Sequence, residues 1–308
     1  MKKKAVCLTV LAVMIAGCST GGESPRPADA PTSEASALDP RSVSTPLDAY
    51  LPSEEVALSL HQAEVKLVNS CFRRLGYDRN PMPEPVPAHP EDLHPEFLMF
   101  TVDQAGKTGY GPSLPPPSAE GSWDKRSTKA QQQILRGEVK LYKGEPVPKG
   151  GCVREAADRI NRGTKVPSKI VGEGFELKRL EHASPTGLGE AHVKVLRLEA
   201  VSRAKADGRV VAVVGKWSKC MSRAGFPYRS LDEAVNDDRW GGDRASPLER
   251  ATARADMVCK GKVKYLNVAS AVQSEYENRV ILQRKTELAT LRSNIKKWGD
   301  NAAQVLGR

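Results

Sequence analysis

Residues 67–77 read Leu-Val-Asn-Ser-Cys-Phe-Arg-Arg-Leu-Gly-Tyr, and residues 216–226 read Lys-Trp-Ser-Lys-Cys-Met-Ser-Arg-Ala-Gly-Phe. Both stretches contain a cysteine, a large apolar residue, three further residues, a glycine and an aromatic residue. This order is typical of a helix that ends in a Schellman motif, in which a left-handed glycine follows the last turn and flanking apolar residues touch. Gly76 and Gly225 then take the left-handed position. We therefore predict two helices that each carry a cysteine one turn before a glycine stop.

Four cysteines lie beyond residue 60, at Cys71, Cys152, Cys220 and Cys259. They form no Cys-x-x-Cys pair, which zinc sites and thiol redox sites commonly use, so we predict two disulfides and no metal site. Spacing alone leaves three connectivities open. The repeated motif favours Cys71–Cys152 and Cys220–Cys259, because each glycine-stopped helix is followed by one further cysteine in a helical stretch.

The N-terminus has the pattern of an export signal. Three lysines precede the apolar run 5–16, and the run ends in Ile15-Ala16-Gly17-Cys18. These last four residues resemble the lipobox of bacterial lipoprotein precursors. The resemblance implies that residues 1–17 are a lipoprotein signal peptide and that Cys18 is lipidated with diacylglycerol. We therefore expect a protein anchored in the cell membrane through this lipid, on the extracytoplasmic face.

Residues 18–52 are rich in Ser, Pro and Ala and have few large apolar side chains, so we predict a disordered tether. Beyond it, Ser53 is the expected N-cap of a helix that runs to the Gly76 stop. Ten prolines lie in the segment 81–117, which predicts a Pro-rich loop without regular helix.

The rest of the chain shows mostly helical periodicity. We expect a helix over 126–143, another from Cys152 to about Gly163, and helices from Gly187 onward. The run 210–214 is a strand by propensity, but the helical phase that follows it favours helix.

These patterns predict a mainly α protein: a disulfide-stapled helical domain with long C-terminal helices, a Pro-rich loop and a disordered N-terminal tether. The first Cys-containing helical repeat is expected over 53–165, with the Pro-rich loop 81–117 inside it. The second is expected over 166–308 and ends in a long C-terminal helix.

Charge suggests a surface role for the C-terminal helices. The chain has 47 Lys+Arg and 37 Asp+Glu, a net charge of +10. Residues 252–308 contain 11 Lys+Arg and 5 Asp+Glu. Such a basic arm near a membrane could contact anionic headgroups or anionic envelope polymers, whereas the alternative is a solvated face beside an apolar core stripe. Nucleic acid is not expected as a partner outside the cell.

Few residues suggest catalysis. No Gly-x-Ser-x-Gly elbow occurs, and Gly106-Lys107-Thr108 lacks the partner glycine of a phosphate loop. His89-Pro-Glu91-Asp92-Leu-His94 is the densest ligand-type cluster, but its prolines break the helix that a His-Glu-x-x-His metal site requires. We predict no catalytic residue, no metal site and no cofactor.

Two further motifs, Cys220-Met221-x-x-x-Gly225-Phe226-x-Tyr228 and the stretch 103–111, resemble a family of actinobacterial exported lipoproteins. The lipobox adds to this resemblance, which covers most of residues 60–265. The resemblance implies a location and an architecture but no reaction. We expect a binding or scaffolding protein of the cell envelope, with an unknown protein partner. The alternative is a cell-wall-acting enzyme with its site in the Pro-rich segment near His89–His94.

Overall fold

The computed structural model describes residues 43–77, 79–84, 94–111, 123–178, 180, 183–242 and 244–308. The predicted signal peptide, the lipidation site Cys18 and the cluster residues 89–92 lie outside these ranges. In the described ranges the chain is mainly helical, as the sequence predicts. Its elements, in chain order, are η2 (Pro46–Tyr50), α1 (Glu54–Arg74), η4 (Pro95–Phe97), α2 (Val102–Thr108), α3 (Trp123–Arg126), α4 (Lys129–Arg136), β1 (Leu141–Tyr142), β2 (Glu145–Pro146), α5 (Gly151–Ile160), β3 (Lys169–Gly172), β4 (Phe175–Lys178), α6 (Pro185–Ala206), α7 (Gly208–Arg223), α8 (Leu231–Val235), α9 (Pro247–Lys262), α10 (Tyr265–Gln283) and α11 (Lys285–Leu306).

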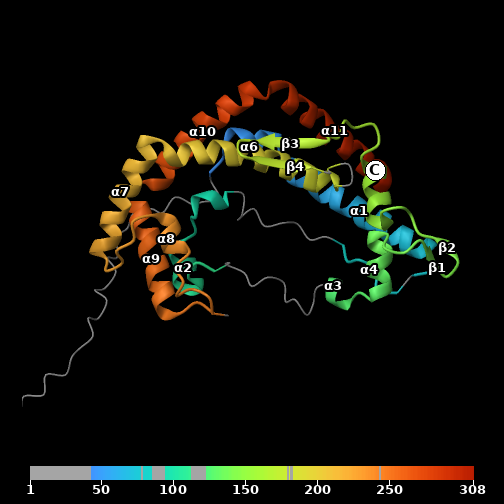
Figure 1. Ribbon diagram of the computed structural model, residues 1–308, viewed down its shortest axis with the longest axis horizontal. Helices are drawn as coiled ribbons and strands as arrows, with labels where there is room; N and C mark the ends of the chain where they lie inside the picture. The colour runs from blue at the N-terminus through green and yellow to red at the C-terminus, as the bar shows by residue number, and fades with distance from the viewer. Residues whose placement is uncertain are drawn as a thin grey trace, which may run out of the picture.

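The helices form an arch (Figure 1). Its crown consists of α6 packed against α10 and of α1 packed against α11, with the antiparallel hairpin β3–β4 lying on α6. One end of the arch contains α2, α7, α8 and α9, and the other contains α3, α4, α5 and the β1–β2 hairpin. No helix in the described ranges is both long and apolar enough to cross a membrane.

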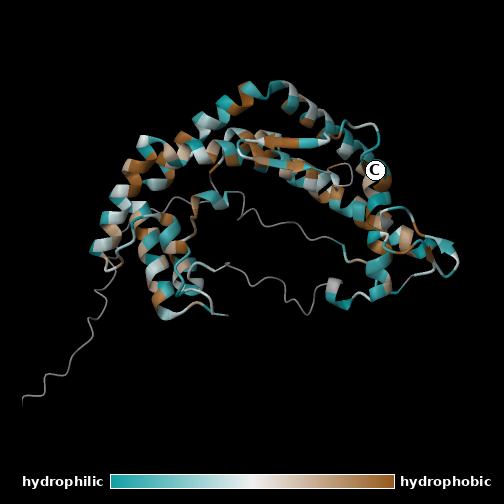
Figure 2. Cartoon of the chain, in the orientation of Figure 1, coloured by the Kyte–Doolittle hydropathy of each residue, from teal (hydrophilic) through white to brown (hydrophobic). Residues whose placement is uncertain are grey.

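Each region of the arch has its own hydrophobic core. The crown core contains Leu60 from α1, Leu196 from α6 and Trp298 from α11, so it joins the two segments predicted as separate repeats. Figure 2 shows the hydrophobic β3 strand lying along this crown. A second core surrounds Trp217 at one end, and a third surrounds Phe72 at the other.

Each end core contains one disulfide, and both predicted pairings are confirmed. Cys71 and Cys152 join α1 to α5 in the third core, and Cys220 and Cys259 join α7 to α9 in the second. The Cα–Cα distance is 5.7 Å in each bridge, within the usual range.

Both predicted Schellman stops are present. At the end of α1, Gly76 has φ +69°, and the Tyr77 amide donates to the Phe72 carbonyl at 2.8 Å. At the end of α7, Gly225 has φ +89°, and the Phe226 amide donates to the Met221 carbonyl at 2.9 Å. The N-cap at Ser53 is also confirmed, because its hydroxyl accepts a hydrogen bond from the Val56 amide at 3.3 Å.

The predicted C-terminal boundary of the tether, residue 52, is wrong. Residues 46–50 form η2, and Leu47 is completely buried in the crown core. Tyr50 and Leu51 pack against the same core, and contacts made by the polar groups of Thr45 and Asp48 also hold the segment in place. The remaining predicted tether, residues 18–42, lies outside the described ranges.

Three other predictions need correction. The helix predicted over 126–143 ends at the left-handed Gly137, and the β1–β2 hairpin follows it. The Pro-rich segment contains α2 in its proline-free window between Pro95 and Pro112. The long C-terminal helix is interrupted at Arg284, where α10 ends and α11 begins. The run 210–214 lies in α7 and is helical, as preferred.

Candidate functional site

Of the cluster predicted over residues 89–94, the structure describes His94. This residue lies under the crown of the arch. It immediately precedes η4, and its side chain is 5% exposed. Its Nε2 lies 3.1 Å from Asp48 Oδ2 and its Nδ1 lies 3.2 Å from Glu96 Oε1. The imidazole is therefore held between two carboxylates from segments that are 46 and 2 residues away in sequence.

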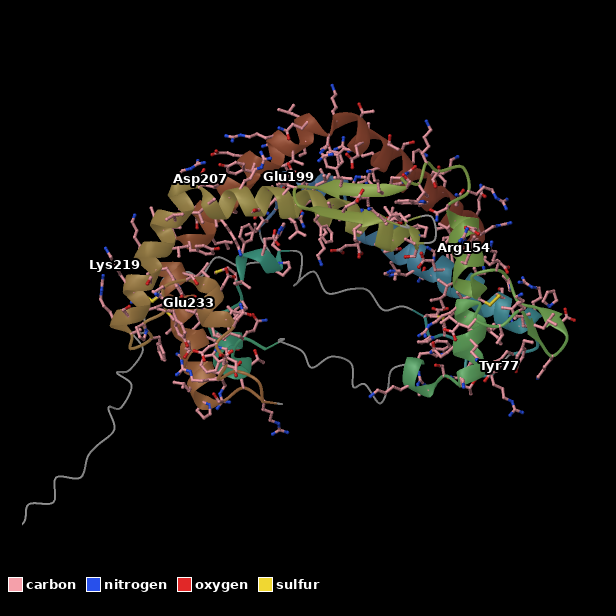
Figure 3. All side chains as sticks on the ribbon, viewed as in Figure 1. Tyr77, Arg154, Glu199, Asp207, Lys219 and Glu233 are labelled. Carbon is pink, nitrogen blue, oxygen red and sulfur yellow. A yellow bond between two sulfur atoms is a disulfide. The ribbon has the colours of Figure 1, made fainter. Side chains whose placement is uncertain are left out.

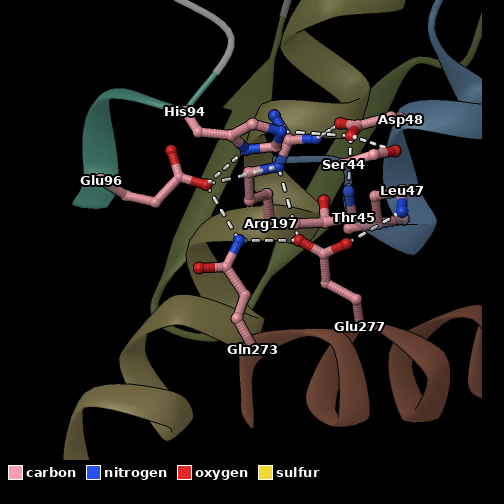
Figure 4. Close-up of polar contacts among 9 residues, drawn as sticks. All are labelled: Ser44, Thr45, Leu47, Asp48, His94, Glu96, Arg197, Gln273 and Glu277. Atoms are coloured by element: carbon pink, nitrogen blue, oxygen red, sulfur yellow. Dashed lines mark hydrogen bonds and ion pairs between the residues drawn. The ribbon is translucent and has the colours of Figure 1, made fainter. Parts of the chain in front are cut away.

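Three side chains from the crown helices complete this cluster (Figure 4). From α6, the Arg197 guanidinium donates to Asp48 and lies 3.5 Å from Glu277 and 3.8 Å from Glu96. From α10, the Gln273 amide donates to Glu96 and Glu277 at 2.9 Å each. We call the six residues the crown network: Asp48, His94, Glu96, Arg197, Gln273 and Glu277.

Backbone amides of the N-terminal segment also enter the crown network. The Leu47 amide donates to Glu277 Oε2 at 2.9 Å, and the Thr45 amide donates to Asp48 Oδ2 at 2.6 Å. Glu277 is completely buried, so the Leu47 amide and the Gln273 side chain replace the water that its carboxylate loses. The network thus attaches the segments around 45–48 and 94–96 to α6 and α10.

The network shifts the pKa values of His94, Glu96 and Asp48 toward their charged forms. Burial alone would lower the pKa of His94, but hydrogen bonds to Asp48 and Glu96 outweigh burial and raise the pKa to about 9. Burial alone would raise the pKa of Glu96 and of Asp48, yet the hydrogen bonds from His94 hold both pKa values below the ordinary range. At neutral pH the imidazole is therefore positively charged and both carboxylates are ionised.

This arrangement does not suit His94 to general-base catalysis. A general base needs a free lone pair near the proton that it removes. A doubly protonated His94 has none at neutral pH, and both of its N–H groups point at carboxylates. The geometry suits a fixed electrostatic connection between chain segments.

A second buried ion pair lies in the core around Trp217. Lys260 Nζ donates to Asp256 Oδ2 at 3.0 Å and to the Leu98 carbonyl at 2.6 Å, and both charged side chains are 0% exposed. Trp217 Nε1 donates to Asp256 Oδ1 at 2.8 Å. Burial raises the pKa of Asp256 and lowers that of Lys260, because the interior disfavours both charges.

Together the two clusters fix the segment 94–100 at several points. Glu96 joins the crown network, Phe97 is buried in the core around Trp217, and the Leu98 carbonyl accepts from Lys260. The Phe100 amide adds a contact to Met257 Sδ at 3.4 Å. The middle of the Pro-rich segment, residues 94–100, is therefore integrated into the arch.

Some of these residues could be recognised from the sequence. Gln273 occupies a position in the apolar stripe of α10, and a polar residue at a core position is a sign of buried hydrogen bonding. Arg197 and Glu277 gave no such sign, because an isolated charge on a helix is normally solvated. Lys107 of the rejected phosphate-loop match lies on α2, where it pairs with Asp103 at 2.6 Å.

Among the described residues, no group of three or more His, Cys, Asp or Glu side chains could hold a metal ion. No protein-family model, no curated protein and no solved structure matches the chain.

Proposed function

We propose that the protein is a lipid-anchored lipoprotein that binds or scaffolds a partner on the extracytoplasmic face of the cell membrane. The observation that carries this proposal is the sequence Ile15-Ala16-Gly17-Cys18 at the end of a basic and then apolar N-terminal segment. The acyl chains on Cys18 would supply the anchor.

The two disulfides support an exported location. Disulfides persist in oxidising compartments and are rare in the reducing cytosol. Cys71–Cys152 and Cys220–Cys259 each join two helices of one end core, so they act as structural bridges. Such bridges suit an extended protein that has to keep its shape outside the cell.

The character of the buried polar groups supports a non-catalytic role. The crown network and the Asp256–Lys260 pair connect chain segments, and their charged groups face one another. The alternative is a cell-wall-acting enzyme with its site near His89–His94. It gains no support from His94, since both ring nitrogens of this residue contact carboxylates. Residues 89–92 lie outside the described ranges.

The anchor is tested by cell fractionation of the Cys18→Ser variant. The parent chain is expected in the membrane fraction, extracted only by detergent, whereas Cys18→Ser is expected to be uncleaved or released from the membrane. Cys7→Ser is the matched control, because Cys7 lies inside the same N-terminal segment but outside the lipobox. The proposal fails if Cys18→Ser loses residues 1–17 and still fractionates with the membrane like the parent and like Cys7→Ser.

A further inference from the structure

Two stretches of the chain contain cations and no acidic residue. Residues 208–231 carry Arg209, Lys216, Lys219, Arg223 and Arg229 without any Asp or Glu. Residues 257–274 carry three lysines, again without an acidic residue. Carboxylates outside these stretches pair with Arg209, Arg229 and Lys260, so the charge that is left without a partner among the described residues belongs to the other five cations.

The disulfide Cys220–Cys259 brings these two stretches together. Its Cα–Cα distance is 5.7 Å, so the last turn of α7 lies beside the last turn of α9. Lys260, beside the bridge, is buried, and the exposed cations near the bridge form what we call the basic end: Lys216, Lys219, Arg223, Lys262 and Lys264. The first three are spaced by three and four residues and therefore share one face of α7. Figure 3 shows Lys219 on the outer side of α7, at one end of the arch.

The cations of the basic end have no carboxylate partners in the part of the chain that the structure describes. Some exposed cations elsewhere do have them: Arg203 pairs with Glu173 and Lys296 pairs with Asp300, at 2.9 Å each. Holding five like charges close together is unfavourable for the folded state and is relieved by an anionic surface.

The start of the described chain relates this end to the anchor. Val43 packs against the core around Trp217, whose outer wall is α7. Cys18 precedes Val43 by 25 residues, and the tether that the sequence predicts there would span on the order of 30 Å. A lipid on Cys18 would thus keep the basic end within reach of the headgroups, where each binding event is effectively intramolecular.

We propose that the basic end docks on anionic phospholipid headgroups and so orients the arch on the membrane that holds its anchor. The orienting role rests on the proposed lipidation of Cys18, whereas the affinity for headgroups does not. Each cation near an anionic bilayer strengthens binding about fivefold at moderate salt, and the attraction decreases as salt screens it.

The affinity is tested without the anchor. Residues 18–308 are prepared with Cys18→Ser and with both disulfides formed, and are mixed with vesicles that contain phosphatidylglycerol or phosphatidylcholine alone. Sedimentation of the vesicles measures the partition coefficient. We expect binding to the phosphatidylglycerol vesicles that declines with added salt, and no binding to the neutral vesicles.

Two triple variants with the same loss of charge separate a site from a general charge effect. Lys216→Ala, Lys219→Ala and Arg223→Ala together should lower the partition coefficient by roughly 100-fold. The matched control replaces three exposed lysines on α1 and α11, namely Lys66, Lys285 and Lys297, by alanine. It should lose much less, and circular dichroism should show both variants folded.

Three results would overturn the inference: no binding of the parent to phosphatidylglycerol vesicles, equal losses in the two triple variants, or binding to a soluble wall polyphosphate polymer but not to vesicles. None of them bears on lipidation of Cys18, which fractionation tests separately.

Discussion

Glu64 lies on α1 against the beginning of α6, in a place where its charge is poorly accommodated. It is largely buried, the Glu190 carboxylate is nearby, and the single compensating contact is a hydrogen bond from the Thr186 amide. Its Oε1 has no hydrogen-bond partner within the described ranges. Burial, with a smaller effect from Glu190, raises the pKa of Glu64 to about 7.

A raised carboxyl pKa destabilises the fold as pH increases. Between the ordinary value of 4.5 and about 7, the unfolded chain loses the Glu64 proton while the folded chain keeps it, so stability declines through that range. Glu64→Gln removes the charge at similar volume. We expect it to raise the free energy of unfolding by up to about 3 kcal/mol above pH 7 and to change it little at pH 4.5. Glu145→Gln, at an exposed residue of β2, is the control. Thermal unfolding at the two pH values measures the effect, and a gain of equal size at both would contradict it.

The crown network has the opposite dependence at its histidine. The folded pKa of His94, about 9, exceeds the ordinary value of 6.5, so its stabilisation is complete below pH 6.5 and disappears as pH rises through 9. His94→Gln should therefore cost about 3 kcal/mol of unfolding free energy at pH 6 and clearly less at pH 9.5. Urea unfolding of parent and variant at both pH values provides the comparison. A penalty independent of pH would mean that His94 contributes packing and no charge.

At the scale of helices and turns, Gly76 and Gly151 both have left-handed backbone, but the space available for a side chain differs between them. Gly76 has φ +69°, but a Cβ there would meet no atom within 4 Å. Gly151 has φ +76°, and a Cβ there would lie 2.2 Å from the Leu135 carbonyl oxygen and 2.4 Å from the Gly137 amide nitrogen. These neighbours are backbone atoms at the end of α4, so the approach of α5 to α4 excludes any side chain.

Alanine substitutions at these two glycines should distinguish backbone strain from a steric clash with neighbouring atoms. Gly76→Ala is expected to cost about 1 kcal/mol, the price of left-handed backbone in an L-residue. Gly151→Ala should cost more than about 3 kcal/mol, because backbone must move as well. Denaturant unfolding measures both, and similar losses in the two variants would contradict the close contact between α4 and α5.

Local signals determined which elements could be predicted. The Schellman stops at Gly76 and Gly225 and the cap at Ser53 depend on a few neighbouring residues, and the structure confirms them. The helix predicted over 126–143 ends at Arg136, because Gly137 adopts a positive φ that stops it. Leu198 fits the apolar period of α6 but is 46% exposed, since the periodicity does not say which side of a long helix meets a neighbour.

The candidate site was harder to predict, because its contacts are distant in sequence. The Leu47 amide and Glu277 are separated by 230 residues, and Arg197 and Asp48 by 149. No local pattern contains such pairs. The disulfides are equally long-range, but the repeated cysteine motif and the small number of cysteines reduced the choice to three pairings.

For the whole molecule, the disulfides are the main covalent restraint on the two ends of the arch. They close loops of 81 and 39 residues, which by chain entropy correspond to about 4.5 and about 4 kcal/mol. Since the bridges lie in different cores, their effects should add. We expect the double serine variants of each pair to lose these amounts in denaturant unfolding. A double serine variant with the same free energy of unfolding as the parent would contradict the stabilisation expected from that disulfide.

The intact mass of the protein extracted with detergent from membranes of its native host tests location and architecture together. We expect a chain that begins at Cys18, carries a diacylglycerol, and has four further cysteines oxidised, with non-reducing peptide maps linking Cys71 to Cys152 and Cys220 to Cys259. A chain that retains residues 1–17, or that lacks the lipid and has free thiols, would contradict the assignment as an exported, disulfide-bonded lipoprotein.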